Sequence, residues 1–519
     1  MGGGLLQLVA YGAQDIYLTG NPQITYFKVV YRRHTNFAME SIEQTFNGTA
    51  KFGSTATCTI ARNGDLMYRS YVRAILPAVT PTAGSNFRWL NWIGHVLIRH
   101  VTLEIGGQEI DKHYGEWFQI WNELSQQPGQ QANYANMVGN VPRLVQPSTS
   151  AKPELELYIP LQFFFCRNPG LALPLIALQY HEVKLIVVFR DLASCYWSEN
   201  GNEPTLNDSQ LSASIWVDYV FLDTDERRRF AQKSHEYLIE QLQTTGDESI
   251  LSTSNRINLP FNHPVKELVW VVQKQSFVNS TSMQPVGGIQ WFNYTDRLDT
   301  TNFTGTPSDY LGGGIGGAAF SGMNPFASMP VSGATYAPNS GVLANTGILA
   351  PSIFGNGNYG NANMDSLTFY DLFGNGNSAG SASAGVAYSA ALPLFDVGHN
   401  PTAFAKLQLN GQDRFTERTG RYFNHVQPYQ HHTNGPAPGI NVYSFALTPE
   451  EHQPSGTCNF SRIDKATLQL NTTQATIQTE SEAANAATTT SETAKVRVYA
   501  TNYNVLRIMS GMGGLAYAN

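Results

Sequence analysis

The residue types best suited to metal chemistry gather in the C-terminal part of the sequence: His425, His431, His432, His452, Glu450 and Glu451. Imidazole and carboxylate groups are common metal ligands, so this group is a candidate metal site. The spacing matches neither HExxH nor the HxH of a cupin-type jelly roll, and adjacent residues of a strand face opposite sides of its sheet. We therefore expect hydrogen-bonded structural histidines, with no metal and no other cofactor.

Thiols and paired acids are the next candidates for catalysis. Cys166 or Cys458 beside a histidine would make a nucleophile pair, but neither thiol has a local signature, and buried inert cysteines are commoner. Asp223, Asp225 and Glu226 are too close along the chain for the carboxylate separation that glycosidases use. The neighbouring pair of glutamates at 450–451 fails for the same reason. Because three arginines follow Glu226, we interpret this stretch as a charged junction between domains.

Two further motifs concern binding and modification rather than catalysis. The run GGGIGG at 312–317 fits GxGxxG, but no buried strand precedes it and no amphipathic helix follows, so nucleotide binding is not expected. Sequons occur at Asn279, Asn293 and Asn302, which are candidate glycosylation sites. The opening sequence lacks the pattern of a secretory signal, which argues against ordinary N-glycosylation. We expect no enzyme activity.

A repeated phrase indicates the elements that carry these residues. LEIGGQEI begins at Leu103 and LQLNGQDR at Leu407, and both read as a half-buried strand running into a tight turn and then a short helix. Other similar pairs follow in the same chain order: Ile42 with Ile239, Val72 with Val269, and Tyr219 with Tyr503. The chain therefore contains two copies of one fold.

The spacing of these pairs locates the loops that differ between the copies. The interval from Val269 to Leu407 is far longer than that from Val72 to Leu103, so the second copy has an insertion, placed at about 281–395. This insertion is rich in Gly, Asn and Ser, and residues 310–364 contain no charged side chain or histidine. Its aromatic content favours a compact excursion that packs against copies of itself. The first copy is longer in the 125–153 loop.

Short segments rich in Val, Ile, Thr, Tyr and Phe, separated by turn residues, predict an all-β protein. The expected fold is two tandem eight-stranded antiparallel jelly rolls with short helices and long loops. We place an N-terminal arm at 1–36, the first jelly roll at 37–222, a junction at 223–236 and the second jelly roll at 237–519.

Composition limits the function classes. The chain has 519 residues and a formal charge of −7, so it lacks the overall basic field that packaging nucleic acid requires. Aromatic residues make up 12% and charged residues only 14%, which suggests that much of the surface is covered by other molecules. Four widely separated cysteines indicate a reducing compartment, and no apolar run reaches the length of a membrane-spanning helix.

Four segments carry a resemblance to a known family: GNPQITYFKVVYRRHTNFAMES from Gly20, LPFNHPVKELVW from Leu259, NGQDRFTERTGRYF from Asn410 and YATNYNVLRIMSGMGGLAYAN from Tyr499. With the strand order, they resemble the double jelly-roll major capsid proteins of nucleocytoplasmic large DNA viruses, including the giant, algal and iridovirus-like groups. The resemblance covers nearly the whole chain and is weakest in the 125–153 loop and the Gly-rich insertion.

The resemblance implies a structural protein made in the host cytoplasm and incorporated in the virion. Three copies would form a pseudo-hexameric homotrimer that tiles an icosahedral shell, with loops at the strand ends forming an outer tower. Minor capsid and penton proteins would be partners, and the arm near the base would contact them or an internal viral membrane. We expect the insertion to clasp subunits within the trimer, and we expect no direct contact with nucleic acid.

The alternative hypothesis is a glycan-binding jelly roll, either a free lectin or a host-attachment surface. Its candidate stacking residues are Trp291, Tyr310 and Tyr336, although such aromatic side chains also serve in packing.

Overall fold

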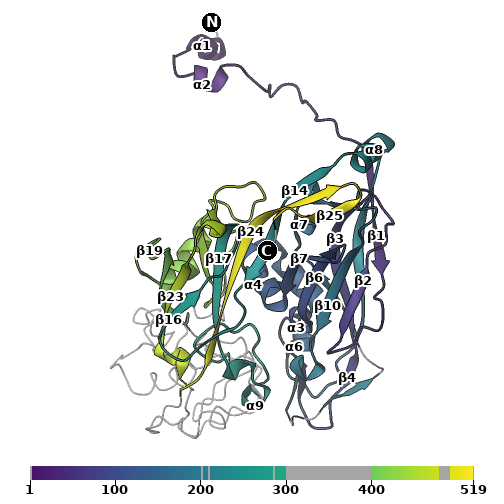
Figure 1. Ribbon diagram of the computed structural model, residues 1–519, viewed down its shortest axis with the longest axis vertical. Helices are drawn as coiled ribbons and strands as arrows, with labels where there is room; N and C mark the ends of the chain where they lie inside the picture. The colour runs from purple at the N-terminus through teal and green to yellow at the C-terminus, as the bar shows by residue number, and fades with distance from the viewer. Residues whose placement is uncertain are drawn as a thin grey trace.

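The computed structural model describes residues 3–199, 201, 203–207, 211–283, 287–299, 399–478 and 491–517. Two β-sandwiches lie side by side, and an N-terminal arm extends from one end (Figure 1). In the first sandwich, one sheet has the order β1-β13-β3-β8 and the other has the order β2-β10-β6-β7. The bounds are β1 Phe37–Gln44, β13 Ser212–Leu222, β3 Leu66–Leu76, β8 Leu155–Pro160, β2 Thr55–Thr59, β10 Val183–Phe189, β6 Ile98–Ile105 and β7 Gln108–Tyr114.

The second sandwich repeats this topology. Its sheets have the orders β14-β24-β17-β21 and β16-β23-β18-β19. In chain order, each sandwich places its first, eighth, third and sixth main strands in one sheet and the second, seventh, fourth and fifth in the other, all antiparallel. The bounds are β14 His235–Thr244, β24 Ala494–Met509, β17 Pro264–Lys274, β21 Asn441–Ser444, β16 Ser254–Asn258, β23 Ala466–Thr472, β18 Thr402–Leu409 and β19 Gln412–Asp413. The double jelly roll is confirmed.

Short elements decorate these sheets. The additional strands are β4 Ala78–Thr80, β5 Phe87–Trp89, β9 Leu173–Pro174, β11 Tyr196–Ser198, β12 Thr205–Asn207, β15 Glu248–Ile250, β20 Arg418–Thr419, β22 Cys458–Asn459 and β25 Met512–Leu515. The helices are α1 Gly3–Val9, α2 Ile16–Thr19, α3 Ile93–Leu97, α4 Gly115–Ser125, α5 Gln131–Val138, α6 Pro142–Val145, α7 Phe164–Arg167, α8 Thr224–Gln232, α9 Ser280–Met283 and α13 Gln427–His431. Helix α8 connects the two sandwiches.

The repeated phrase forms a tight hairpin in each sandwich. Gly106 and Gly107 have φ of 59° and 86°, and Asn410 and Gly411 have φ of 51° and 81°. Two successive left-handed residues are the signature of a type I′ turn, which glycine and asparagine tolerate best. The hairpins join β6 to β7 and β18 to β19. The prediction that each phrase leads directly into a helix was wrong, because a second strand comes first.

Strand register tests the other repeated pairs. Tyr219 and Tyr503 lie in the corresponding strands β13 and β24, as predicted. The pair Ile42 and Ile239 is wrong by three residues, although β1 and β14 do correspond. Ile42 lies opposite Val217. The residue equivalent to Val217 in the second sandwich is Thr501, which lies opposite Leu242.

The insertion of the second sandwich lies in the connection from β17 to β18. The structure describes α9 and residues 287–299 at its beginning, whereas residues 300–398 lie outside the described residues, including the 312–317 glycine run. The longer loop of the first sandwich corresponds to α5 and α6, in the connection from β7 to β8. Helices α6 and α9 lie at the end of the molecule opposite the arm (Figure 1).

Candidate assembly surfaces

Helix α4 joins the two sandwiches through an apolar face. Trp117 and Trp121 are one helical turn apart, so both point to the same side, where they pack on Val269 and Val271 of β17 and on Tyr499 of β24. The ring centroids of Trp117 and Tyr499 are 5.3 Å apart. Strand β17 is therefore buried on both faces, which explains the uninterrupted apolar run from Leu268 to Val272.

A buried ionic network crosses the same junction. The Glu240 carboxylate of β14 lies 2.7 Å from Lys266 Nζ and 3.0 Å from a guanidinium nitrogen of Arg167, which belongs to the first sandwich. Burial alone would raise the pKa of Glu240, but Arg167, the nearby His452 and Lys266 lower this pKa to about 2. The side chain of Lys266 is only 1% exposed. The network thus replaces the lost hydration of these charges by direct pairing.

The candidate metal group separates into structural contacts. His432 lies between two carboxylates, 3.0 Å from Glu267 and 2.9 Å from Glu450. His431 Nδ1 donates to the Leu447 carbonyl oxygen, and His452 lies 3.7 Å from Glu240. His425 and Glu451 are exposed. Within the described ranges, no group of three or more His, Cys, Asp or Glu side chains is placed to hold a metal ion.

Because of His432, the unfolding free energy is expected to fall as the pH becomes alkaline. Burial alone would lower its pKa, but Glu267 and Glu450 raise it from 6.5 to about 9. The stabilisation by the imidazolium is therefore complete below pH 6.5 and is lost as pH rises through about 9, a loss on the order of 3 kcal/mol. Urea denaturation between pH 6 and 9.5 measures it. The His432→Gln variant should show a flatter profile, and an identical slope in the variant would refute the assignment.

The candidate thiol nucleophiles have raised pKa values in this structure. All four cysteines lie in the described part of the chain and are free thiols, and Cys58, Cys166 and Cys195 are buried. Burial raises the pKa of the Cys166 thiol to about 12. Burial also raises the pKa of Cys458, which is partly exposed. A thiol that stays protonated near neutral pH is a poor nucleophile.

The acidic residues that precede the arginines, Asp223, Asp225 and Glu226, stabilise the start of helix α8. The Asp223 carboxylate accepts a hydrogen bond from Thr224 N at the start of the helix, and Asp225 and Glu226 occupy its first turn. Negative charges are favourable there because they interact with the partial positive charge of the helix N-terminus. Arg227 then reaches back to Asp65 of the first sandwich at 3.0 Å. These charges serve the connection between the sandwiches.

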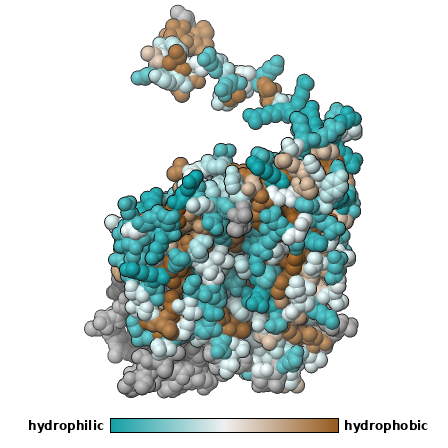
Figure 2. Space-filling model, viewed as in Figure 1, coloured by the Kyte–Doolittle hydropathy of each residue, from teal (hydrophilic) through white to brown (hydrophobic). Residues whose placement is uncertain are grey.

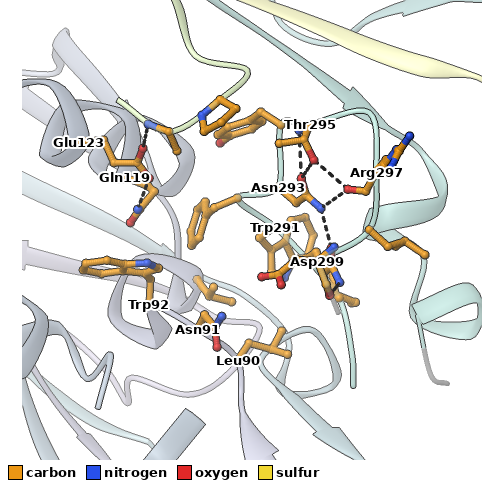
Figure 3. Close-up of a pocket in the computed structure, with 18 of the residues that line it drawn as sticks. Leu90, Asn91, Trp92, Gln119, Glu123, Trp291, Asn293, Thr295, Arg297 and Asp299 are labelled. Atoms are coloured by element: carbon orange, nitrogen blue, oxygen red, sulfur yellow. Dashed lines mark hydrogen bonds between the residues drawn. The ribbon is translucent and has the colours of Figure 1, made fainter. Parts of the chain in front are cut away.

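Two of the three candidate glycosylation sites lie in the described residues, and they differ in accessibility. Asn279 is exposed, and its side-chain oxygen accepts from Thr281 N. The Asn293 amide nitrogen donates to Gln290 Oε1 at 2.7 Å and to the Arg297 carbonyl at 2.9 Å (Figure 3). Attaching a glycan to that nitrogen would remove at least one of these bonds. Asn302 lies outside the described residues.

A cavity of about 290 Å³ lies between the sandwiches, with Trp92 and Glu123 on one side and residues 289–299 on the other (Figure 3). Trp291 was a candidate for stacking on sugars. The Arg190 guanidinium instead lies over the Trp291 ring, 3.9 Å from the ring centroid, and Trp291 Nε1 donates to the Ser194 carbonyl. The packing interpretation therefore explains Trp291. Tyr310 and Tyr336 lie outside the described residues.

The N-terminal arm has the most exposed apolar side chains. Across residues 3–36, which the structure describes, no side chain is buried, and Tyr17, Tyr26 and Phe27 are 88% exposed or more. The arm leaves the body next to α8 and projects away from it (Figures 1 and 2). None of the helices in the described ranges is long and apolar enough to cross a membrane. Such an apolar segment is suited to contact with another molecule.

Comparison with known proteins identifies the family. Residues 226–514 match the model described as large eukaryotic DNA virus major capsid protein, and residues 25–223 match the major capsid protein N-terminus. The chain belongs to the large eukaryotic DNA virus major capsid proteins. It is 51% identical to the major capsid protein of Phaeocystis pouchetii virus and 43% identical to that of Paramecium bursaria Chlorella virus 1, in both cases over all of each chain.

A solved structure of this family supports the same fold. The crystal structure of PBCV-1 VP54, fitted into a reconstruction of the virophage Sputnik, is 37% identical in sequence and superposes with a TM-score of 0.63. The alignment covers 95% of this chain and 100% of VP54. As a major capsid protein, the chain is a structural component of the virion shell.

Proposed function

We propose that three copies of this major capsid protein form a pseudo-hexameric capsomer that tiles an icosahedral shell. The observation that carries the proposal is the pair of sandwiches with identical strand order, joined into one block by α4 and the ionic network around Glu240. Three such blocks around a threefold axis present six similar sides, so one building unit suits a hexagonal lattice. The proposed role is structural and requires no catalysis.

Each part of the chain has a separate role in this proposal. Residues 37–222 supply the first barrel. The second barrel, predicted at 237–519, begins with β14 at His235, so the connection predicted at 223–236 ends two residues earlier. The end that carries α6 and α9 would form the outer tower, and the insertion at about 281–395 would clasp neighbouring subunits. The arm, residues 1–36, leaves from the opposite end, which suits contact with minor capsid or penton proteins or an internal membrane.

Electron microscopy of negatively stained protein tests the capsomer directly. We expect particles with hexagonal outlines and threefold symmetry in purified material. A variant that lacks residues 300–395 should give fewer intact particles, because it has lost the proposed clasp. Particles that never exceed the size of one chain at high concentration would refute the proposal.

Removing the arm is expected to leave the body intact. A chain that begins at His34 should unfold with a free energy within about 0.5 kcal/mol of the full chain, because residues 3–33, the described part of the removed segment, bury no side chain. Thermal unfolding followed by circular dichroism measures the difference in unfolding free energy. Destabilisation of the truncated body would contradict the role assigned to the arm.

Flotation with phosphatidylcholine vesicles tests whether the partner of the arm is a membrane. If it is, the full chain should rise with the lipid and the truncated chain should not.

A further inference from the structure

A second cleft between the sandwiches has many charged side chains in its lining. Its volume is about 680 Å³, within the range of small-molecule sites. Strands β6 and β7 line one side, and β24 with the turn after β14 lines the other. The cations are Arg99, Lys112, Arg190, Lys495 and Arg497, and the carboxylates are Glu116, Asp191 and Asp247. The formal charge of the lining is therefore positive.

Pairing within the cleft leaves part of this charge unneutralised. Glu116 binds Arg190 at 2.6 Å, and Asp247 binds both Lys495 and Arg497. Two cations, Arg99 and Lys112, make no ion pair among the described residues. Lys112 Nζ instead lies 5.8 Å from the centroid of the Tyr114 ring. Both cations are close enough to the cleft to contact a ligand in it.

Two further groups of the cleft wall bear on the charge of a ligand there. Arg190 Nε is buried and has no hydrogen-bond partner in the described structure, so the cleft wall has an unused donor. His100 lines the same cleft. Burial, together with the nearby cations Lys112, Arg99 and Arg190, lowers the pKa of His100 to about 4. The positive formal charge of the lining therefore does not depend on His100.

We propose that this cleft binds a compact polyanion carrying phosphoryl or sulfate groups, held by Arg99, Lys112 and the free donor of Arg190. Guanidinium and ammonium groups recognise tetrahedral oxyanions through charge-assisted hydrogen bonds. The cleft accommodates a single small molecule, and the whole chain has a formal charge of −7, so a nucleic acid duplex is not the expected occupant. These three residues belong to the first sandwich, and Lys495 and Arg497 of the second sandwich line the opposite side of the cleft.

Isothermal titration calorimetry of the full-length protein with sodium tripolyphosphate tests this site. We expect saturable binding with a Kd below about 1 mM, consistent with several charge-assisted contacts. The double variant Arg99→Gln, Lys112→Gln should bind at least about tenfold more weakly. The control is Arg228→Gln, Arg229→Gln, which removes the same charge from the exposed face of α8 and should bind like the wild type. Equal weakening in both variants, or absence of binding, would overturn the proposal.

Melting curves separate binding from loss of fold. Saturating tripolyphosphate should raise the melting temperature of the wild type by at least about 2 °C, because the ligand binds only the folded state. The cleft variant should melt cooperatively and show a smaller rise, whereas the α8 control should match the wild type. Sulfate, orthophosphate and pyrophosphate identify the preferred anion, and sodium chloride at equal ionic strength excludes screening. A rise that chloride reproduces would contradict a specific site.

Discussion

The Glu240→Gln variant is expected to lose about 3–5 kcal/mol of unfolding free energy, the usual cost of removing one partner from a buried ion pair. The substitution keeps the shape of the side chain and removes its charge. Lys266, which is 1% exposed, then has no full counter-charge at 2.7 Å, and Arg167 loses its contact across the two sandwiches. Urea denaturation at pH 7 measures the loss.

Two variants control this experiment. Glu236→Gln makes the same change on the same strand, but Glu236 and its partner Arg507 are 60% and 52% exposed, so the expected loss is at most about 1 kcal/mol. Glu240→Gln combined with Lys266→Met removes both buried charges and should recover part of the stability. Equal losses in Glu236→Gln and Glu240→Gln would contradict the structural role of the network.

The dependence of stability on acidic pH is an independent check on the role of Glu240. Its folded-state pKa of about 2 lies below its ordinary value of 4.5, so the ionised carboxylate contributes stability that is present above pH 4.5. This contribution is lost as pH falls from 4.5 towards 2. The wild type should therefore lose more stability over this interval than Glu240→Gln does.

The Trp117→Ala variant is expected to cost about 3–5 kcal/mol and to weaken the coupling between the sandwiches. Trp117 is 4% exposed, and its ring fills the space between α4 and the sheet that contains β17 and β24. Because the partners belong to different sandwiches, the variant should unfold in two steps rather than together. Calorimetry resolves the two transitions.

The control variant is Tyr429→Ala. Its side chain is 88% exposed, so the substitution should change the unfolding free energy by less than about 0.5 kcal/mol. A single transition with unchanged midpoint in Trp117→Ala would show that α4 does not couple the sandwiches.

The local sequence pattern was sufficient to predict the fold. The alternation around Leu103 and Leu407, followed by Gly-Gly and Asn-Gly, predicts a strand and a tight turn, and the structure has hairpins at both places. Register was harder to predict. A short alternating segment such as that around Ile239 resembles its counterpart at several shifts, and only pairing with β24 selects one of them.

The assembly surfaces were only partly visible in the sequence. Glu240 and Arg167 are far apart along the chain, so no local spacing reveals their contact. A signal was nevertheless present, because Lys266 and Glu267 directly precede the apolar run Leu268–Val272, and buried charges there require partners. The cleft around Arg99 depends on how two sandwiches face each other, which neither half of the sequence specifies alone.

The central claim is that the two-sandwich chain is the unit of a trimeric capsomer. Light scattering of the purified full-length protein, coupled to size-exclusion chromatography, measures its mass in solution most directly. The account predicts a mass equal to three chains that persists on dilution into the micromolar range. A stable mass of one chain at high protein concentration would contradict it.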